Sequence, residues 1–132
     1  MARRDMLTDI TTAALERGMS GLHARQTAVA ANIANIETPR YRAKRVVFEE
    51  SLASAIAAER SRFGRRQRGA IDGVEPQMKT RNDAWRRDGN TVDIETEMVA
   101  AAKTSAHYKM LARVLAKKFR MLRNAINGGA NQ

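Results

Sequence analysis

Side chains that could support acid–base or metal chemistry are few and widely separated in this sequence. The two histidines, His23 and His107, each lack a second histidine, or a carboxylate at metal-ligand spacing, beside them. Glu95 and Glu97 form the best carboxylate pair, but residues two apart do not share a helix face. The sequence has no glycine-rich phosphate loop, no serine elbow and no cysteine. It therefore predicts a protein that is not an enzyme and that binds no metal, other cofactor or small-molecule ligand.

Asparagine side chains offer a different chemistry, hydrogen bonding to the backbone. Pro39 biases Thr38 away from the α region, so a preceding helix must end near Ile36. Asn32 and Asn35 are three residues apart and share a face at that predicted helix end. There they can bond to carbonyls that a helix end leaves unpaired, or to a neighbouring stretch of backbone. Ordinary turn chemistry is the alternative interpretation.

A first long helix is predicted to position these asparagines, from about residue 5 to residue 36, with Asp5 as its cap. Its seam has apolar and small polar residues three and four apart: Thr8, Thr12, Leu15, Met19, Leu22, Gln26, Val29, Ile33 and Ile36. A neighbouring stripe consists of small residues: Ala14, Gly18, Gly21 and Ala28. Small residues let another helix approach closely. The alternative is a flexible joint at the two glycines.

The second long helix is predicted over residues 91–127, with Asp93 as a candidate cap and Gly128-Gly129 as its stop. Its seam keeps heptad spacing: Ile94, Met98, Ala101, Ser105, Tyr108, Ala112, Leu115, Phe119, Leu122 and Ile126. A flanking stripe widens the apolar face: Leu111, Val114, Met121 and Ala125. This face is broader than one partner helix needs. We therefore predict a coiled-coil-like hairpin whose helices also pack against other helices.

Residues 37–90 are predicted to be less regular. Phe48, Leu52 and Ile56 share one face and indicate a short third helix over about residues 48–60. The arginine-rich stretch 60–68 reads as a linker, and residues 70–90 as a loop or a short β-like excursion. We expect disorder near residues 60–85 in the free monomer. The predicted fold is a single all-α domain over residues 1–132.

Composition limits the possible partners. The chain is 43% hydrophobic but only 5% aromatic, and its net charge is +10. That charge favours acidic partners such as nucleic acid, anionic lipid or an acidic protein groove. A basic helical nucleic-acid-binding protein is the main alternative function. It is disfavoured because the arginines of residues 60–68 flank only one aromatic residue, Phe63. No apolar run approaches membrane-spanning length, and no signal-peptide apolar region follows Arg3-Arg4.

Two segments together resemble a known family, the bacterial flagellar axial proteins of the rod and hook. The first matches the signature at the end of their N-terminal helix, through Asn32, Ile33, Ala34, Asn35, Thr38, Pro39 and Tyr41. The second resembles the C-terminal part of the smallest proximal-rod proteins, through Asp88, Gly89, Asn90, Val92 and Asp93. One departure is Arg40, where the family usually has glycine. A left-handed turn at Arg40 would cost about 1–2 kcal/mol. Another is Ala31, where many members have asparagine.

The resemblance implies a structural subunit of the proximal rod of the flagellar basal body. Such subunits polymerise through their terminal helices into a hollow tube, with copies of themselves and other rod proteins. They are exported without a cleaved signal and assemble near the membrane ring and the export gate. Our candidates for helix packing and assembly come from both seams and the flank: Leu15, Met19, Leu22, Val29, Ile33, Met98, Tyr108, Leu111, Val114, Leu115, Phe119, Leu122 and Ile126.

Overall fold

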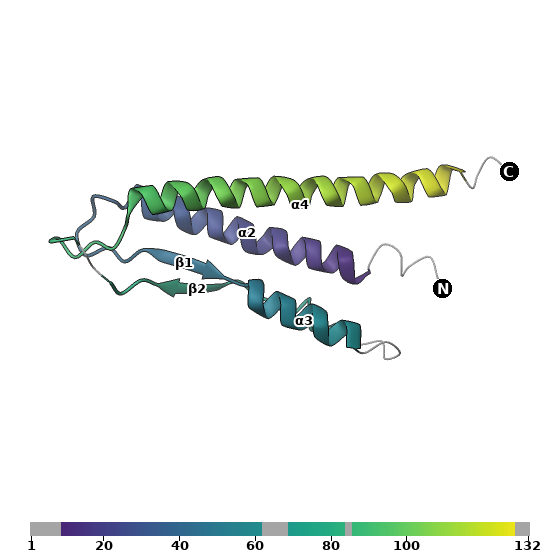
Figure 1. Cartoon of the computed structure of the whole chain (residues 1–132), viewed down its shortest axis with the longest axis horizontal. Helices are drawn as coiled ribbons and strands as arrows, with labels where there is room; N and C mark the ends of the chain where they lie inside the picture. The colour runs from purple at the N-terminus through teal and green to yellow at the C-terminus, as the bar shows by residue number, and fades with distance from the viewer. Residues whose placement is uncertain (1–8, 62–68, 84–85, 129–132) are drawn as a thin grey trace.

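The computed structural model describes residues 9–61, 69–83 and 86–128. Its elements, in chain order, are α2 (Ile10–Ala34), β1 (Lys44–Val47), α3 (Glu49–Ser61), β2 (Gln77–Thr80) and α4 (Ile94–Gly128). Two long terminal helices and a short third helix dominate (Figure 1), which confirms the predicted all-α class. The two-stranded sheet is an addition that the helical periodicity did not show. No described helix is long and apolar enough to cross a membrane.

Both long helices begin at an aspartate cap. Asp9 has extended backbone angles, and its carboxylate accepts the Thr12 N–H at 2.8 Å. Helix α2 therefore begins at Ile10, and the predicted cap Asp5 lies outside the described residues. Asp93 accepts the Glu95 N–H at 3.1 Å and the Thr96 hydroxyl at 2.6 Å, so it caps α4 as predicted.

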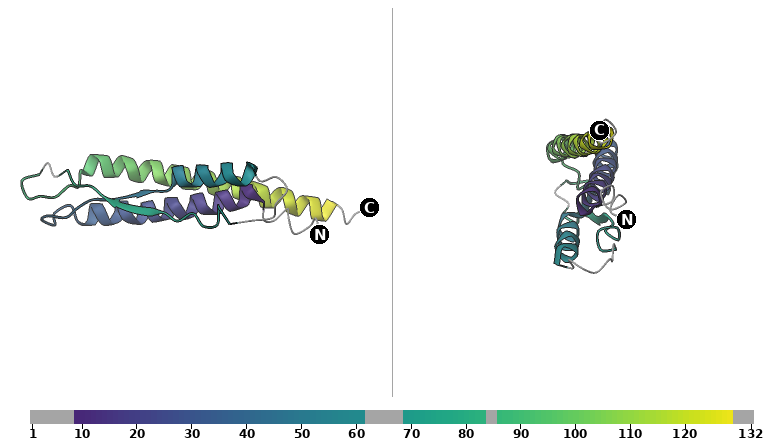
Figure 2. Two further views of the ribbon diagram at one scale, coloured as in Figure 1. Left: turned by 90° about the horizontal axis from the view of Figure 1, so that it is seen from below. Right: turned by 90° about the vertical axis from the view of Figure 1, so that its right-hand side faces the viewer.

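Helix α2 is the central element of an elongated molecule. It packs against α4 on one side and against β1 and α3 on the other (Figures 1 and 2). Its glycines make this possible. A Cβ at Gly18 would lie 3.1 Å from Leu111 Cδ1, and one at Gly21 only 2.5 Å from the Phe48 ring. The small stripe therefore serves close packing, within a helix that runs unbroken through both glycines.

The face of α4 that meets α2 coincides with only part of the predicted seam. Glu97 and Thr104 are its buried residues, and Tyr108 and Leu111 pack against the core of Leu22, Val46 and Phe48. Leu111, placed on the flank by the sequence pattern, occupies the space that Gly18 leaves free. Four predicted seam residues are exposed: Ile94 at 38%, Met98 at 62%, Phe119 at 46% and Ile126 at 70%. The other six seam residues are half-buried. Apolar spacing alone did not reveal where the seam leaves this face.

The middle of the chain is more ordered than predicted. β1 and β2 are antiparallel, with Lys44 opposite Thr80 and Val47 opposite Gln77. Ile71 is fully buried and clusters with Ala55 of α3 and with Val74. The expected disorder is therefore wrong for residues 69–83, because strand pairing and this cluster hold them. Residues 62–68, with most of the arginine run, and Trp85 lie outside the described residues.

Candidate functional site

The two sequence motifs meet where α2 ends and α4 begins (Figure 1). We call this region, residues 32–44 and 86–97, the turn junction. Hydrogen bonds within the junction connect the first motif to the segment around the start of α4, although the two are far apart in sequence. Several of these contacts fix one element of the region relative to another.

Asn32 connects three elements from a fully buried position. Its amide nitrogen donates to the Lys44 carbonyl at 2.8 Å and to Glu97 Oε2 at 3.0 Å. Its amide oxygen accepts the Lys44 N–H at 2.8 Å and the Tyr41 hydroxyl at 3.3 Å. All four hydrogen-bonding positions of the amide are therefore used. One side chain thus joins α2, β1 and α4.

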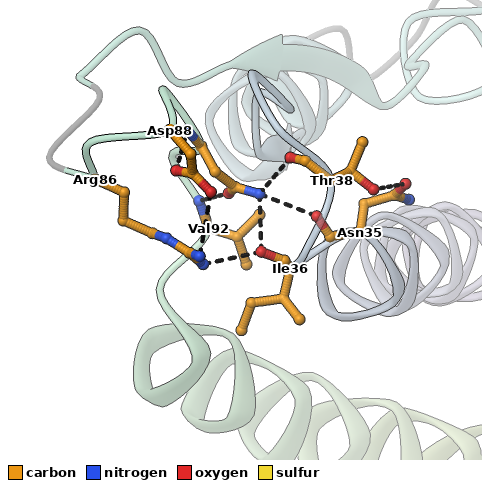
Figure 3. Close-up of polar contacts among 7 residues, drawn as sticks. Asn35, Ile36, Thr38, Arg86, Asp88 and Val92 are labelled. Carbon is orange, nitrogen blue, oxygen red and sulfur yellow. Dashed lines mark hydrogen bonds and ion pairs between the residues drawn. The ribbon is translucent and has the colours of Figure 1, made fainter.

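Asn90, also fully buried, closes the end of α2. Its amide nitrogen donates to the carbonyls of Asn35 at 3.0 Å, Ile36 at 3.0 Å and Thr38 at 2.8 Å (Figure 3). Its amide oxygen accepts the Val92 N–H at 2.7 Å. Each of these carbonyls also accepts a second hydrogen bond, from the Thr38 N–H, Arg86 and the Tyr41 N–H respectively. A side chain some fifty residues away in sequence therefore reinforces the turn that follows α2.

Asn35 acts locally, in contrast to Asn32 and Asn90. It is the C-cap of α2, and its amide nitrogen donates to the Ala31 carbonyl at 2.8 Å. Its amide oxygen accepts the Thr38 hydroxyl at 3.1 Å. Thr38 and Pro39 are exposed on the turn itself. The first motif therefore combines one residue for long-range bonding with one for turn shape.

Arg86 and Thr91 also hold the junction, although the sequence analysis gave neither residue a role. Arg86 donates to the Ile36 carbonyl at 2.9 Å and pairs with Asp88 at 3.2 Å (Figure 3). The Thr91 hydroxyl accepts the Ala43 N–H at 2.7 Å. Thr91 belongs to the second motif, but only its distant partner reveals its role. Arg86 has no local sequence signal that would predict its role.

Arg40 adopts the left-handed conformation that its family position requires, with φ of 61°. Its N–H donates to the Asp88 carbonyl at 3.0 Å. Gly89 also has positive φ, and a Cβ there would lie 3.3 Å from Arg40 Cγ. The turn therefore keeps its left-handed shape in spite of the missing glycine. The strain of about 1–2 kcal/mol stays at Arg40.

A buried carboxylate shapes the electrostatics of the junction. Glu97 is buried at the start of α4 and accepts its hydrogen bond from Asn32. Burial, and then the negative charge of Glu97, raise the pKa of the Tyr41 hydroxyl. At the edge of the junction, the hydrogen bond from Thr96 holds the pKa of Asp93 below its usual value. Tyr41 is therefore a neutral donor at physiological pH.

The packing candidates divide into two groups in the structure. Those toward the interior are buried or half-buried: Leu15, Met19, Leu22, Val29, Ile33, Tyr108, Leu111, Leu115 and Leu122. Those facing solvent are Met98, Val114, Phe119 and Ile126. Val99, Met110 and Met121 are further large apolar residues exposed on α4.

In the second motif, Val92 is buried with Asn90. Ala34 ends α2 at an exposed position.

No reaction chemistry emerges from these groups. His23 and His107 are exposed, and they lie on different helices. Among residues 9–61, 69–83 and 86–128, no three histidine or acidic side chains gather as they would around a metal ion. The polar groups of the turn junction are instead satisfied by one another. Such an arrangement sets geometry between helices.

Comparison with known proteins agrees with both motifs. The family described as "Flagella basal body rod protein" matches residues 14–42, which include most of α2 and its turn. The flagellar basal body rod protein FlgB of Salmonella typhimurium is 30% identical over 116 residues, covering 80% of this chain and 84% of the relative. FlgB of Bacillus subtilis is 29% identical over 118 residues, covering 87% and 92%. This chain therefore belongs to the FlgB family of flagellar basal body rod proteins.

Proposed function

We propose that this chain is a structural subunit of the proximal rod of the bacterial flagellar basal body, polymerising through α2 and α4. The observation that carries the assembly mechanism is the apolar surface that α4 leaves uncovered. We call Met110, Val114 and Met121 the outer flank; they are 56%, 46% and 56% exposed. Their spacing of four and seven puts them on one side of the helix. Exposed apolar patches of this kind mark interaction sites.

The geometry of the two helices supports a neighbouring helix as the partner. Lys118 pairs with Asp9 at the start of α2, and α4 continues to Gly128 beyond that contact (Figure 1). Phe119 and Ile126 are exposed near or beyond that level. A head-to-tail interface through such a surface does not close on itself, and so it generates a helical filament. Copies of this chain and other rod proteins are the proposed partners.

The turn junction has a positioning role in this proposal. In a tube, the angle between α2 and α4 determines where each subunit presents its apolar surfaces. Asn32 and Asn90 fix that angle through buried hydrogen bonds, which are geometrically more specific than apolar contacts. We also propose that the whole chain forms one domain, since α2 contacts α3, β1 and α4.

Family membership supports three further parts of the proposal. The subunit is exported by the flagellar type III apparatus without a cleaved signal. It resides in the periplasmic part of the basal body. At the base of the rod it contacts the membrane ring and the export gate. Each part rests on likeness to the rod family, and a pull-down of assembled basal bodies with antibodies to this chain would test the contacts.

Val114→Glu tests the assembly surface. The side chain is exposed, so the isolated subunit should keep its helix content and its unfolding temperature. In the rod, an unpaired charge buried against a neighbour costs several kcal/mol. We expect cells with Val114→Glu to make and export the subunit but to lack rods and to be non-motile. Phe119→Glu should behave in the same way, because Phe119 faces solvent rather than α2.

Ala116→Glu is the matched control, because it adds the same charge to an exposed position of the same helix. By helical spacing, Ala116 lies away from both α2 and the outer flank. Motility assays and isolation of basal bodies would compare the strains, with circular dichroism on the purified variants. Normal swimming with intact rods in the Val114→Glu strain would show that this flank is not an assembly surface.

A further inference from the structure

The small sheet has one closed edge and one open edge. The outer edge of β1 is covered by side chains of α2. Asn32 bonds to both the N–H and the C=O of Lys44, each at 2.8 Å. Arg25 donates to the Val46 carbonyl at 2.9 and 3.2 Å. Both backbone groups of Lys44 and the carbonyl of Val46, which face away from β2, are therefore occupied.

Among residues 9–61, 69–83 and 86–128, no comparable hydrogen bonds cover the outer edge of β2. The Arg81 N–H donates to the Ala43 carbonyl at 2.9 Å, so residues 43 and 81 form a hydrogen-bonded pair. Such pairs alternate along an antiparallel ribbon, which makes 45/79 and 47/77 the next ones. The N–H and C=O groups of Met78 and Thr80 therefore point away from β1. All residues of β2 are exposed, and the strand lies on the far side of β1 from α2 (Figure 1).

Positive charge gathers on this ribbon without local compensation. Arg45 lies directly opposite Lys79, and like charges in register repel each other. Lys44, in the same strand, is also exposed. The nearby Arg81 is paired with Asp83 at 3.4 Å. Within the described part of the chain, the salt bridges do not include Lys44, Arg45 or Lys79. An anionic group beside this ribbon would relieve the repulsion.

We propose that the open edge of β2 binds an extended acidic segment of a partner protein by strand addition. The partner backbone would bond to Met78 and Thr80, and its carboxylates would lie beside Lys79 and Arg45. Backbone pairing at an exposed sheet edge is a known mode of peptide recognition, in which alternate side chains give specificity. This surface is separate from the helix faces proposed for polymerisation, so it stands whether or not those faces assemble.

The experiment uses the full chain and a short synthetic peptide of alternating glutamate and valine. A peptide of alternating glutamine and valine is its neutral control. Titration followed by amide resonances should shift residues 77–81 with the acidic peptide, and the affinity should fall as salt is raised. Equal affinity for the neutral peptide would overturn the acidic specificity. Binding to anionic lipid vesicles but not to the peptide would overturn the proposal in favour of a lipid surface.

Two variants separate backbone pairing from charge. Thr80→Pro removes an N–H that points away from β1, so the ribbon should persist while strand addition is blocked. Lys79→Glu should weaken peptide binding about tenfold or more, whereas Lys109→Glu on the exposed face of α4 should not. Wild-type affinity in a folded Thr80→Pro variant would exclude strand addition. If that variant does not fold, wild-type affinity in Lys79→Glu still overturns the proposal. If the unmodified chain binds neither peptide, the proposal is wrong. Lys79 would then have the role of keeping an exposed strand edge from pairing with other chains.

Discussion

The turn junction and the distal half of α4 differ in whether their side chains find partners within the same subunit. At the junction, Asn32 and Asn90 are fully buried, and their amide groups find partners within the same chain. Along distal α4, Met110, Met121 and Ile126 are large, apolar and exposed. Buried polar groups cost free energy unless they are paired, and exposed apolar surface costs free energy until it is covered. The first region is complete in one subunit, and we infer that the second is completed by neighbours.

This contrast separates two kinds of substitution. A change at the junction should destabilise the isolated subunit, because the hydrogen bonds are internal to it. A change on the outer flank should leave the subunit intact and affect only assembly.

Asn90→Ala should have the largest effect on the free energy of unfolding. It removes the donor to three carbonyls at the end of α2 and the acceptor for Val92. Four hydrogen bonds of about 0.5–1.5 kcal/mol each are lost, and the buried Val92 N–H is left without its partner, so we expect a loss of about 3 kcal/mol or more. Denaturant unfolding of the purified variant measures this. Asn124→Ala, at an exposed position of α4, is the control and should change stability by less than about 0.5 kcal/mol.

Asn35→Ala tests a local contact of the turn junction, in contrast to the long-range bonds of Asn90. Its bonds are local, to Ala31 and Thr38, and Asn35 is only partly buried. We expect a loss of about 1 kcal/mol, typical of a cap or turn contact. Equal losses for Asn35→Ala and Asn90→Ala would mean that the long-range bonds of Asn90 contribute little. Both variants should also reduce motility while the protein is still made.

Arg40→Gly should act in the opposite direction. Arg40 has a φ of 61°, which glycine adopts without a steric penalty. Relief of about 1–2 kcal/mol is offset in part by the greater freedom of glycine in the unfolded chain, which leaves a gain of up to about 1 kcal/mol. The midpoint of urea unfolding should therefore rise. An unchanged or lower midpoint would show that exposed Arg40 makes compensating contacts in the folded state.

Local sequence signals predicted the parts of this fold that depend on local contacts. Asp93 as a cap, the end of α2 near Ile36 and the third helix all follow from residues within a few positions of one another. The left-handed position at Arg40 was recognisable only because the family usually has glycine there. These features needed no knowledge of distant partners.

Contacts distant in sequence were not accessible in the same way. The three carbonyls bound by Asn90 and the pairing of β1 with β2 join segments whose local patterns are unremarkable. On α4, Leu111 lies against Gly18 of α2, whereas Phe119 is exposed. A heptad pattern with an apolar flank permits either residue to face α2, and only the partner surface of α2 decides between them.

The contact between Asp9 and Lys118 provides the smallest predicted effect. Burial of Asp9 raises its pKa, but hydrogen bonds from Lys118 and Thr12 outweigh that and hold the pKa below the usual 3.8. The folded pKa is thus lower than the unfolded one. The interaction therefore stabilises the fold fully above the unfolded value, and this contribution is lost as pH falls through the folded value.

Asp9→Asn isolates the charge, because asparagine caps a helix about as well as aspartate. The Asp9 side chain is 43% exposed and solvent screens the pair, so we expect a cost of about 0.5 kcal/mol at neutral pH. The cost should vanish below the folded pKa of Asp9, where the carboxyl group is neutral in both states. Thermal unfolding of both proteins across this pH range measures the difference. A cost that persists unchanged in acid would assign the effect to the cap geometry rather than to the ion pair that joins the start of α2 to α4.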